Sequence, residues 1–143
     1  MKNVFEKSDI MSILPHRGKM LLLDEAYMLD GKAYGKYFVR GDEWFLDGHF
    51  PGNPVVPGVI LCEILAQSAC VLLDGSIKDG ATPFFTGINE ARFKGTVKPG
   101  DAVSTECVIT KSKGQFYFAS GQVRVGSKLC VKADFSFAIV DGN

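Results

Sequence analysis

Two residues near the middle of the chain could carry acid–base chemistry. His49 lies in a segment rich in glycine and proline, and Glu63 follows fourteen residues later inside an apolar run. An imidazole and a carboxyl group held in an apolar site are the usual pair for taking and giving protons in catalysis. The alternative is that His49 is a loop residue bound to backbone and that Glu63 is neutralised by a core arginine. These two residues alone do not decide between the alternatives.

The run around Glu63 is unusually apolar. From Val59 to Leu73 the only other polar residues are Gln67 and Ser68. Such a run predicts a helix that is apolar on all sides and is therefore covered by protein or lipid. Burying an ionisable group there is costly unless the group is paired or neutralised. Glu63 therefore needs an explanation, and function is the leading one.

A membrane-spanning helix is the weaker interpretation of this run. Pro57 and Gly58 interrupt its start, and Glu63 lies near its middle. A spanning helix needs roughly 20 largely apolar residues and strongly disfavours a carboxylate at mid-membrane. We therefore expect a buried helix over residues 57–74 and no membrane span.

The start of this helix could stabilise negative charge. First-turn N–H groups lack helical partners and carry the positive end of the helix dipole. Gly58 would let a ligand approach the backbone closely, so that its N–H could form an oxyanion hole. The alternative is that Gly58 only relieves crowding between helix and sheet. Gln67, one turn beyond Glu63 on the same face, could hold the carboxylate or satisfy backbone groups.

Helix geometry constrains how His49 can reach Glu63. With a rise of about 1.5 Å per residue, Glu63 lies roughly 7 to 9 Å along the axis from the helix start. His49 must fold back along the helix, or it must meet the Glu63 of a second copy of the chain.

The remaining pattern predicts an α+β fold. We expect a short helix over residues 8–14 with Ser8 as its N-cap, a buried strand start at 20–23, and a hairpin through Asp30-Gly31 into a strand at 33–40. Glycine and proline exclude a regular element between Gly41 and Pro57. Four further strands are expected at residues 84–93, 102–111, 115–125 and 129–140. The prediction is one domain over residues 1–143, a curved antiparallel sheet of about six strands wrapped around one long apolar central helix.

Composition narrows the setting of the protein. Sixteen basic and sixteen acidic side chains cancel among 143 residues, so no global field favours nucleic acid or an anionic membrane. The cysteines are widely separated among apolar neighbours, which indicates buried thiols in a reducing compartment: Cys62, Cys70, Cys107 and Cys130. The N-terminus lacks the apolar stretch of a signal peptide, and we expect a cytoplasmic protein.

Several segments together resemble a known family. They are Leu14-Pro15-His16-Arg17, Gly48-His49-Phe50-Pro51-Gly52, Pro54-Val55-Val56-Pro57-Gly58-Val59, Glu63-Ile64-Leu65-Ala66-Gln67, Ala91-Arg92-Phe93-Lys94 and Val97-Lys98-Pro99-Gly100-Asp101. In this order, over nearly the whole chain, they resemble the hot-dog-fold β-hydroxyacyl-[acyl carrier protein] dehydratases of the FabZ type. The related FabA type has aspartate at the position of Glu63, so glutamate favours FabZ.

The resemblance implies a substrate and roles for the residues. The substrate would be a (3R)-hydroxyacyl thioester on acyl carrier protein, and the product a trans-2-enoyl thioester in fatty acid biosynthesis. His49 would remove the proton beside the carbonyl, Glu63 would protonate or orient the departing hydroxyl, and the Gly58 N–H would hold the thioester oxygen. No metal or other cofactor is implied. Residues expected to line the acyl tunnel are Phe50, Val59, Phe84 and Phe93.

The resemblance also implies partners. A homodimer would bring His49 to the partner's Glu63, and the dimers commonly assemble in threes to a homohexamer. Acyl carrier protein is acidic, so a local basic rim is expected, with these candidates: Arg92, Lys94, Lys98, Lys128 and Lys132. Each of these five is also compatible with ordinary solvated surface.

Some features depart from the family or leave alternatives open. Gly18-Lys19-Met20 stands where the family often has an aromatic residue and proline, and His16 with its neighbours is interpreted as structural. The alternatives are a hot-dog thioesterase or hydratase and a non-catalytic acyl-binding subunit. The sequence does not predict the preferred acyl-chain length or a secondary isomerase activity.

Overall fold

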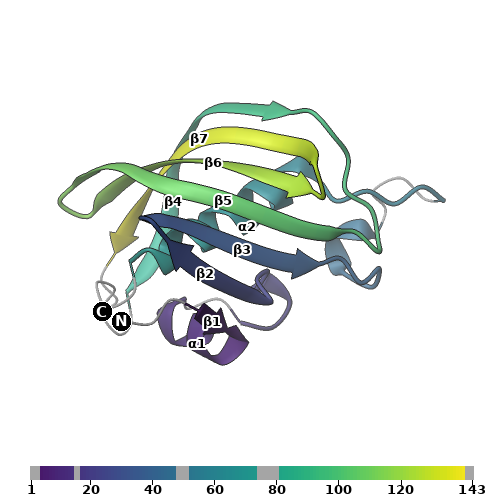
Figure 1. Cartoon of the computed structure of the whole chain (residues 1–143), viewed down its shortest axis with the longest axis horizontal. Coiled ribbons are helices and arrows are strands. Elements are labelled where there is room, and N and C mark those ends of the chain that lie inside the picture. Colours follow the sequence, from purple (N-terminus) through teal and green to yellow (C-terminus); the bar gives the residue numbers. More distant parts are fainter. Residues whose placement is uncertain (1–3, 15–16, 48–51, 74–80, 141–143) are drawn as a thin grey trace.

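The computed structural model describes residues 4–14, 17–47, 52–73 and 81–140. Both histidines, His16 and His49, and the predicted binding residue Phe50 lie outside the described residues. The described chain forms an antiparallel sheet that curves across the molecule, with helix α2 packed against one side of it (Figure 1).

The sheet has seven strands in the order β1-β2-β3-β5-β6-β7-β4. Their bounds are Val4–Glu6 (β1), Glu25–Leu29 (β2), Lys32–Phe38 (β3), Thr82–Phe93 (β4), Ala102–Lys113 (β5), Phe116–Val125 (β6) and Lys128–Val140 (β7). The expectation of about six strands missed β1. Three residues are too few to show an alternating pattern, and only pairing with β2 makes this segment a strand.

The later half of the chain follows its predicted pattern closely. The four strands expected after Pro83 are present as β4 to β7, each within two residues of its predicted bounds. The hairpin through Asp30-Gly31 is also confirmed, since β2 pairs with β3 across it. On β7 the alternate residues Val131, Ala133, Phe135 and Phe137 are buried, as expected for one face of a strand.

Helix α2 spans Gly58–Val71 and is buried along most of its length. It contacts five strands, β2, β3, β5, β6 and β7. Because protein covers it on several sides, the helix can be apolar nearly all round. In the part of the chain that the structure describes, neither α-helix is long and apolar enough to span a membrane.

The first helix, α1, spans Lys7–Ile13, and its N-cap is Glu6 rather than the predicted Ser8. The Asp9 carboxylate accepts a hydrogen bond from the Glu6 backbone N–H at 2.9 Å. This hydrogen bond satisfies the Glu6 N–H at the start of the helix, and β1 ends at Glu6 as well. The pairing of β1 therefore sets where the helix begins.

Two sequence predictions about local structure were wrong. Residues 20–23 do not begin a strand: a 3₁₀ turn, η1, spans Gly18–Met20, and the ladder begins only at Glu25. Leu21, Leu22 and Leu23 are buried, but burial alone does not provide a strand partner. A second 3₁₀ turn, η2, occupies Trp44–Leu46 in the segment expected to be irregular. Its backbone hydrogen bonds are local, so no sheet partner is needed.

The prediction that the cysteines are buried thiols is confirmed. All four thiols are free and buried. Cys107 belongs to β5 and donates a weak hydrogen bond from its thiol to the carbonyl of Ala33 on β3, at 3.8 Å.

Candidate active site

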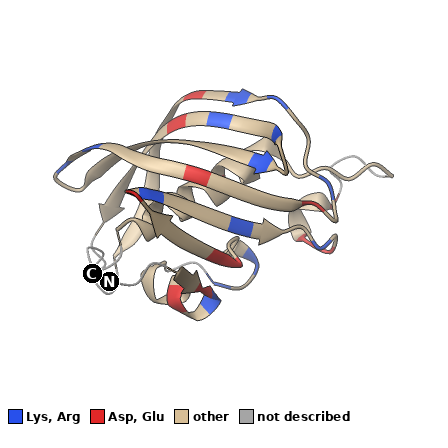
Figure 2. Ribbon diagram, in the orientation of Figure 1, with Lys and Arg blue, Asp and Glu red and all other residues tan. Residues whose placement is uncertain are grey.

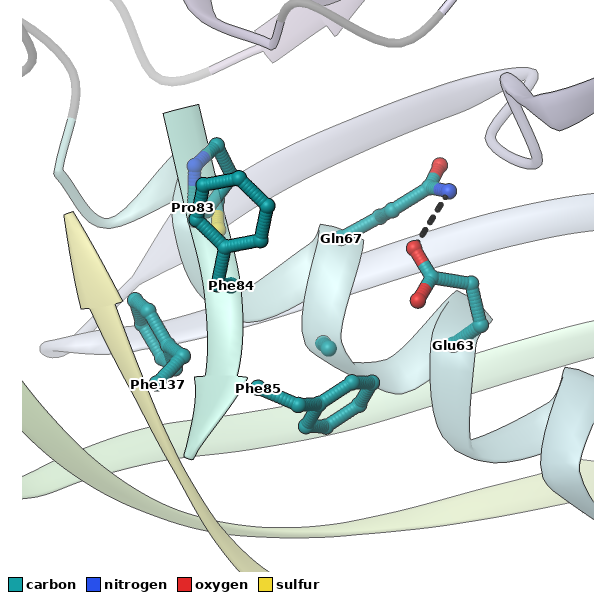
Figure 3. A pocket seen from close by; sticks show the side chains of 8 residues that line it. Glu63, Gln67, Pro83, Phe84, Phe85 and Phe137 are labelled. Carbon is teal, nitrogen blue, oxygen red and sulfur yellow. Dashed lines mark hydrogen bonds between the residues drawn. The ribbon is translucent and has the colours of Figure 1, made fainter. Parts of the chain in front are cut away.

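A pocket of about 210 Å³ lies between α2 and the corner where β4 meets β7. One stripe of α2 forms a wall of it, with Glu63, Ala66, Gln67 and Cys70 spaced as neighbours on a single helix face. The facing wall is apolar and consists of Pro83, Phe84, Phe85 and Phe137 (Figure 3). The pocket is smaller than the usual site for a drug-sized ligand.

Gln67 holds the carboxylate at the edge of this pocket. Its Nε2 donates to Glu63 Oε2 at 2.9 Å, and Figure 3 shows the two side chains pointing toward each other. The same amide also bonds backbone: Nε2 donates to the Met20 carbonyl at 2.8 Å, and Oε1 accepts the Leu22 N–H at 2.9 Å. The two roles that the sequence left open for Gln67, holding the carboxylate and satisfying backbone, are therefore both present.

The start of α2 is occupied by an aromatic ring. A Cβ added at Gly58 would lie 2.6 Å from Cε1 of Phe93. This contact requires glycine for packing, which is the alternative explanation that the sequence left open. Phe93 is not among the pocket-lining residues. Val59, which follows Gly58, is 68% exposed and also lies outside the lining. Of the described tunnel candidates, only Phe84 lines this pocket.

The Cys70 thiol belongs to the pocket lining, two helical turns beyond Glu63, and it is unreactive. Burial, followed by the negative charge of Glu63, raises the pKa of Cys70. The thiol therefore stays neutral at physiological pH and is a poor nucleophile. Among the residues that the structure describes, no group of three or more His, Cys, Asp or Glu side chains could hold a metal ion.

Strand β4 leaves an apolar edge uncovered within the described chain. It is the last strand of the sheet, and its exposed large side chains include Phe84, Phe85, Ile88 and Phe93, between 39% and 55% exposed. A long edge strand with such side chains is prone to pair with another chain. The edge adjoins the pocket, because Phe84 and Phe85 belong to both.

Basic side chains gather beside β4 and β7, but acidic ones accompany them. Arg92, Lys94 and Lys132 line a second hollow together with Glu90 and Asp134. Figure 2 shows this alternation of positive and negative residues on the two strands. Arg92 pairs with Glu90 at 2.9 Å, so part of the positive charge is neutralised locally.

Sequence reasoning missed most of the pocket wall. Ala66 and Cys70 follow Glu63 by three and seven residues, and this helical spacing was a usable signal. Phe85 and Phe137 had none, because β4 pairs with β7 across more than fifty residues of chain and only that pairing brings both residues to the same wall.

The N-terminal segment around Leu14 is structural, as expected. The Arg17 guanidinium donates to the Leu14 carbonyl at 2.7 Å and to the Met11 carbonyl at 2.8 Å. These carbonyls belong to the last turn of α1, which lacks further helical donors. Arg17 therefore ties the end of α1 to the η1 turn.

Comparison with known proteins agrees with this geometry. The family model described as FabA-like domain matches residues 14–134. The chain is 38% identical to 3-hydroxyacyl-[acyl-carrier-protein] dehydratase FabZ of Caulobacter sp. (strain K31), over 98% of this chain and 91% of the relative. It is 43% identical to the FabZ of Halalkalibacterium halodurans, over 92% of this chain and 96% of the relative.

Solved structures show the same fold at lower sequence identity. The dehydratase heterocomplex ApeI:P from Xenorhabdus doucetiae matches with a TM-score of 0.78 at 19% identity, over 92% of this chain and 91% of that one. The fluoroacetyl-CoA thioesterase FlK matches with a TM-score of 0.67 at 12% identity, over 79% and 88%. These likenesses establish the hot-dog fold. With the family match covering most of its length, the chain belongs to the FabA-like family.

Proposed function

We propose that this protein dehydrates (3R)-hydroxyacyl-[acyl carrier protein] to trans-2-enoyl-[acyl carrier protein] in fatty acid biosynthesis. One observation carries the proposal within the structure: a buried amide holds the Glu63 carboxylate at the edge of an apolar pocket. The names of the curated relatives support the same reaction. The glutamate at position 63, rather than aspartate, favours the FabZ type of chemistry.

The reaction needs one base and one acid. His49 takes the proton from the carbon beside the thioester carbonyl, and Glu63 gives a proton to the 3-hydroxyl group. The C3–O bond breaks, water leaves, and a double bond forms between the second and third carbons. The role of His49 rests on the family motif at residues 48–52, because this residue lies outside the described part of the chain. General acid–base steps of this kind contribute about 10²- to 10⁴-fold each.

The first turn of α2 is proposed to stabilise the thioester oxygen. Negative charge builds on this oxygen as the proton leaves, and the Gly58 N–H is positioned at the helix start, where anions are favoured. Val59 and Phe50 are proposed to contact the substrate beside it.

The packing of Phe93 provides a test of this role for Gly58. The Gly58→Ala change must displace the Phe93 ring. If crowding is the only reason for glycine, Phe93→Leu will restore the activity of Gly58→Ala. If the substrate also needs the open backbone, the double variant will stay more than tenfold below Phe93→Leu alone.

We further propose a homodimer formed along β4, assembling in threes to a homohexamer. The exposed apolar residues of β4 support a second copy as the partner, and they adjoin the pocket wall. In the dimer, His49 of one copy would reach Glu63 of the other. Acyl carrier protein would dock at a basic rim drawn from Arg92, Lys94, Lys98, Lys128 and Lys132. No nucleic-acid partner is proposed.

The unit that performs this reaction is proposed to be one hot-dog domain over residues 1–143. Helix α2 would serve as its one long central helix, which its contacts with five strands support. We propose that the protein acts in the cytoplasm, where free cysteine thiols persist.

A thioester assay separates this function from its alternatives. Incubating the protein with a (3R)-hydroxyacyl thioester should produce enoyl absorbance. Release of free thiol instead would indicate a thioesterase. His49→Ala and Glu63→Ala should each lower turnover by orders of magnitude. If both variants stay within about threefold of the unaltered chain, the acid–base assignment is wrong and an acyl-binding role takes its place.

A further inference from the structure

The pocket beside Glu63 deepens along α2 toward the C-terminal end of the helix. Ala66, Gln67 and Cys70 follow Glu63 in the lining, and each of the three is at most 8% exposed. Glu63 itself is only partly buried. Within α2, which the structure describes throughout, no residue before Glu63 belongs to the lining. The carboxylate therefore lies at the outer end of this helix face and Cys70 at its inner end.

Phe137, in the wall that faces α2, is held firmly by its neighbours. It is 2% exposed, and its ring stacks on Tyr117 and Phe135 with centroids 5.5 and 6.3 Å away. Figure 3 shows Phe137 on the side of the pocket away from Glu63. Because protein interiors are close-packed, a ring held in this way does not move aside easily. A ligand that extends from Glu63 toward Cys70 therefore meets a wall that does not yield.

The proposed substrate has one apolar part that fits this space. Its thioester end is polar and is joined to acyl carrier protein outside the pocket, whereas the carbons beyond C3 are apolar. With Glu63 acting at the 3-hydroxyl group, those carbons extend past the carboxylate toward Ala66 and Cys70. Burial there removes them from water, which stabilises the complex. The acyl tail therefore follows α2 and ends near Cys70.

Two estimates give the length of tail that the pocket holds. Cys70 follows Glu63 by seven residues, which is about 10 Å along the helix axis. An extended chain advances about 1.2 Å per bond, one third of the reach of a residue, so this distance spans roughly eight carbons. By volume, a cavity of about 150 Å³ holds the six carbons of benzene, so the pocket of about 210 Å³ also holds roughly eight.

We propose that Cys70 is a specificity-determining residue that limits the acyl chain to roughly ten to twelve carbons, with Phe137 as the fixed wall of the pocket. This inference rests on the proposed dehydratase function and adds the chain length of its substrate. One methylene group too many in an apolar pocket costs about ten- to two-hundredfold in kcat/KM. The limit should therefore be sharp.

The test measures kcat/KM with (3R)-hydroxyacyl-[acyl carrier protein] of four to sixteen carbons. For the unaltered protein, we expect the sixteen-carbon value to lie at least tenfold below the ten-carbon value. Cys70→Leu enlarges the side chain at the inner end and should lower the ratio of the ten- to the four-carbon value at least tenfold. Cys70→Ala removes the sulfur atom and should raise the ratio of the fourteen- to the ten-carbon value at least threefold.

Cys62→Ala is the matched control for Cys70→Ala. Cys62 is a buried thiol on the same helix, 4% exposed, and it lies outside the pocket lining. The control loses the same atom from the interior of the protein, so its melting temperature should fall, but its ratios of kcat/KM should stay within twofold of the unaltered protein. Melting temperatures show whether each variant is folded. Cys70→Val, with the same expected direction, takes the place of a Cys70→Leu variant that does not fold.

The opposite directions of the two Cys70 variants separate pocket length from damage to the fold. If both variants keep ratios within twofold of the unaltered protein, Cys70 does not set the chain length and the inference is wrong. It is also wrong if both variants shift the ratios in the same direction, as general damage would. If the unaltered protein dehydrates no chain of any length, the proposed function fails and this inference fails with it.

Discussion

Two polar clusters start from neighbouring residues of α2 and serve different ends. The core cluster consists of Ser68, Thr105 and the Gly35 N–H. Ser68 Oγ donates to the Ile64 carbonyl at 2.9 Å and lies 2.6 Å from Thr105 Oγ1, which accepts the Gly35 N–H at 2.9 Å. If Thr105 donates to Ser68, each hydroxyl hydrogen has an acceptor inside the protein. This cluster joins the helix to β3 and β5.

The pocket cluster consists of Glu63 and Gln67 with the backbone of Met20 and Leu22. Gln67 hydrogen-bonds buried backbone on one side, as the core cluster does. On the other side it bonds the Glu63 carboxylate, which lines a pocket. The difference teaches how to interpret polar residues in an apolar helix. A cluster whose partners are all interior holds the fold together, whereas one that ends at a cavity can present a group to a ligand.

The largest expected effect separates the two clusters by activity. Glu63→Gln keeps the shape of the side chain but removes the acid, and we expect kcat to fall about 10³-fold. The melting temperature should change by less than about 3 °C, because Gln67 can still bond the new amide oxygen. Steady-state kinetics and calorimetry measure the two quantities. Glu25→Gln, an exposed carboxylate paired with Lys36, is the control and should leave both unchanged. If Glu63→Gln unfolds the protein, the role of Glu63 is structural rather than catalytic.

The next effect belongs to the core cluster and concerns stability. A Cβ at Gly35 would overlap Ser68 Oγ and come within 2.8 Å of Leu23 Cδ2. Gly35→Ala should therefore cost about 3 kcal/mol of unfolding free energy, measured by urea denaturation. The folded fraction should keep its kcat. A cost under about 1 kcal/mol would mean that helix and sheet are less tightly joined here than the contacts imply.

A smaller effect tests the hydrogen bonds of the core cluster alone. Thr105→Val keeps the shape of the side chain but leaves the buried Gly35 N–H without its acceptor, which costs about 2 kcal/mol. Thr110→Val is the matched control on the same strand, since its hydroxyl is exposed and bonds the Phe118 carbonyl. The control should change stability by no more than about 0.5 kcal/mol. Equal losses in the two variants would argue against a special role for the cluster.

The smallest effect concerns a carboxylate that is structural and lies near the surface. Glu43 accepts hydrogen bonds from the Tyr37 hydroxyl at 2.7 Å and from the backbone N–H groups of Arg40 and Gly41 at 2.9 and 2.8 Å. Burial alone would raise the pKa of Glu43, but these hydrogen bonds reverse the shift and lower it. A pKa lower in the folded than in the unfolded chain stabilises the fold above the ordinary carboxyl pKa.

That contribution is lost as the pH falls through the folded-state pKa of Glu43. Glu43→Gln should therefore cost about 1 kcal/mol at neutral pH, after allowance for solvent screening, and nothing in strong acid. Thermal unfolding across a pH series measures this difference, with the exposed neighbour variant Asp42→Asn as control. A cost that does not depend on pH would show that packing, not charge, is lost. Unlike Glu63→Gln, the Glu43→Gln substitution should leave kcat unchanged.

Local rules account for the parts of the fold that were predicted correctly. The apolar run over α2, the four alternating strands after Pro83 and the Asp30-Gly31 turn are visible because each depends on residues close in sequence. The contact between Glu63 and Gln67 belongs to the same class, since residues four apart share a helix face. The family motifs directed attention to the same stretch of chain.

Pairings between distant segments decided the rest. Strand β1 exists only through β2. Residues 20–23 failed as a strand although Leu21, Leu22 and Leu23 are buried as foreseen, because the Gln67 amide takes the Leu22 N–H. The ring that crowds Gly58 belongs to Phe93, 35 residues further on. Phe137 reaches the pocket only by pairing with β4. Periodicity shows which side chains are buried, but the identity of each partner depends on how the sheet and α2 close around one another.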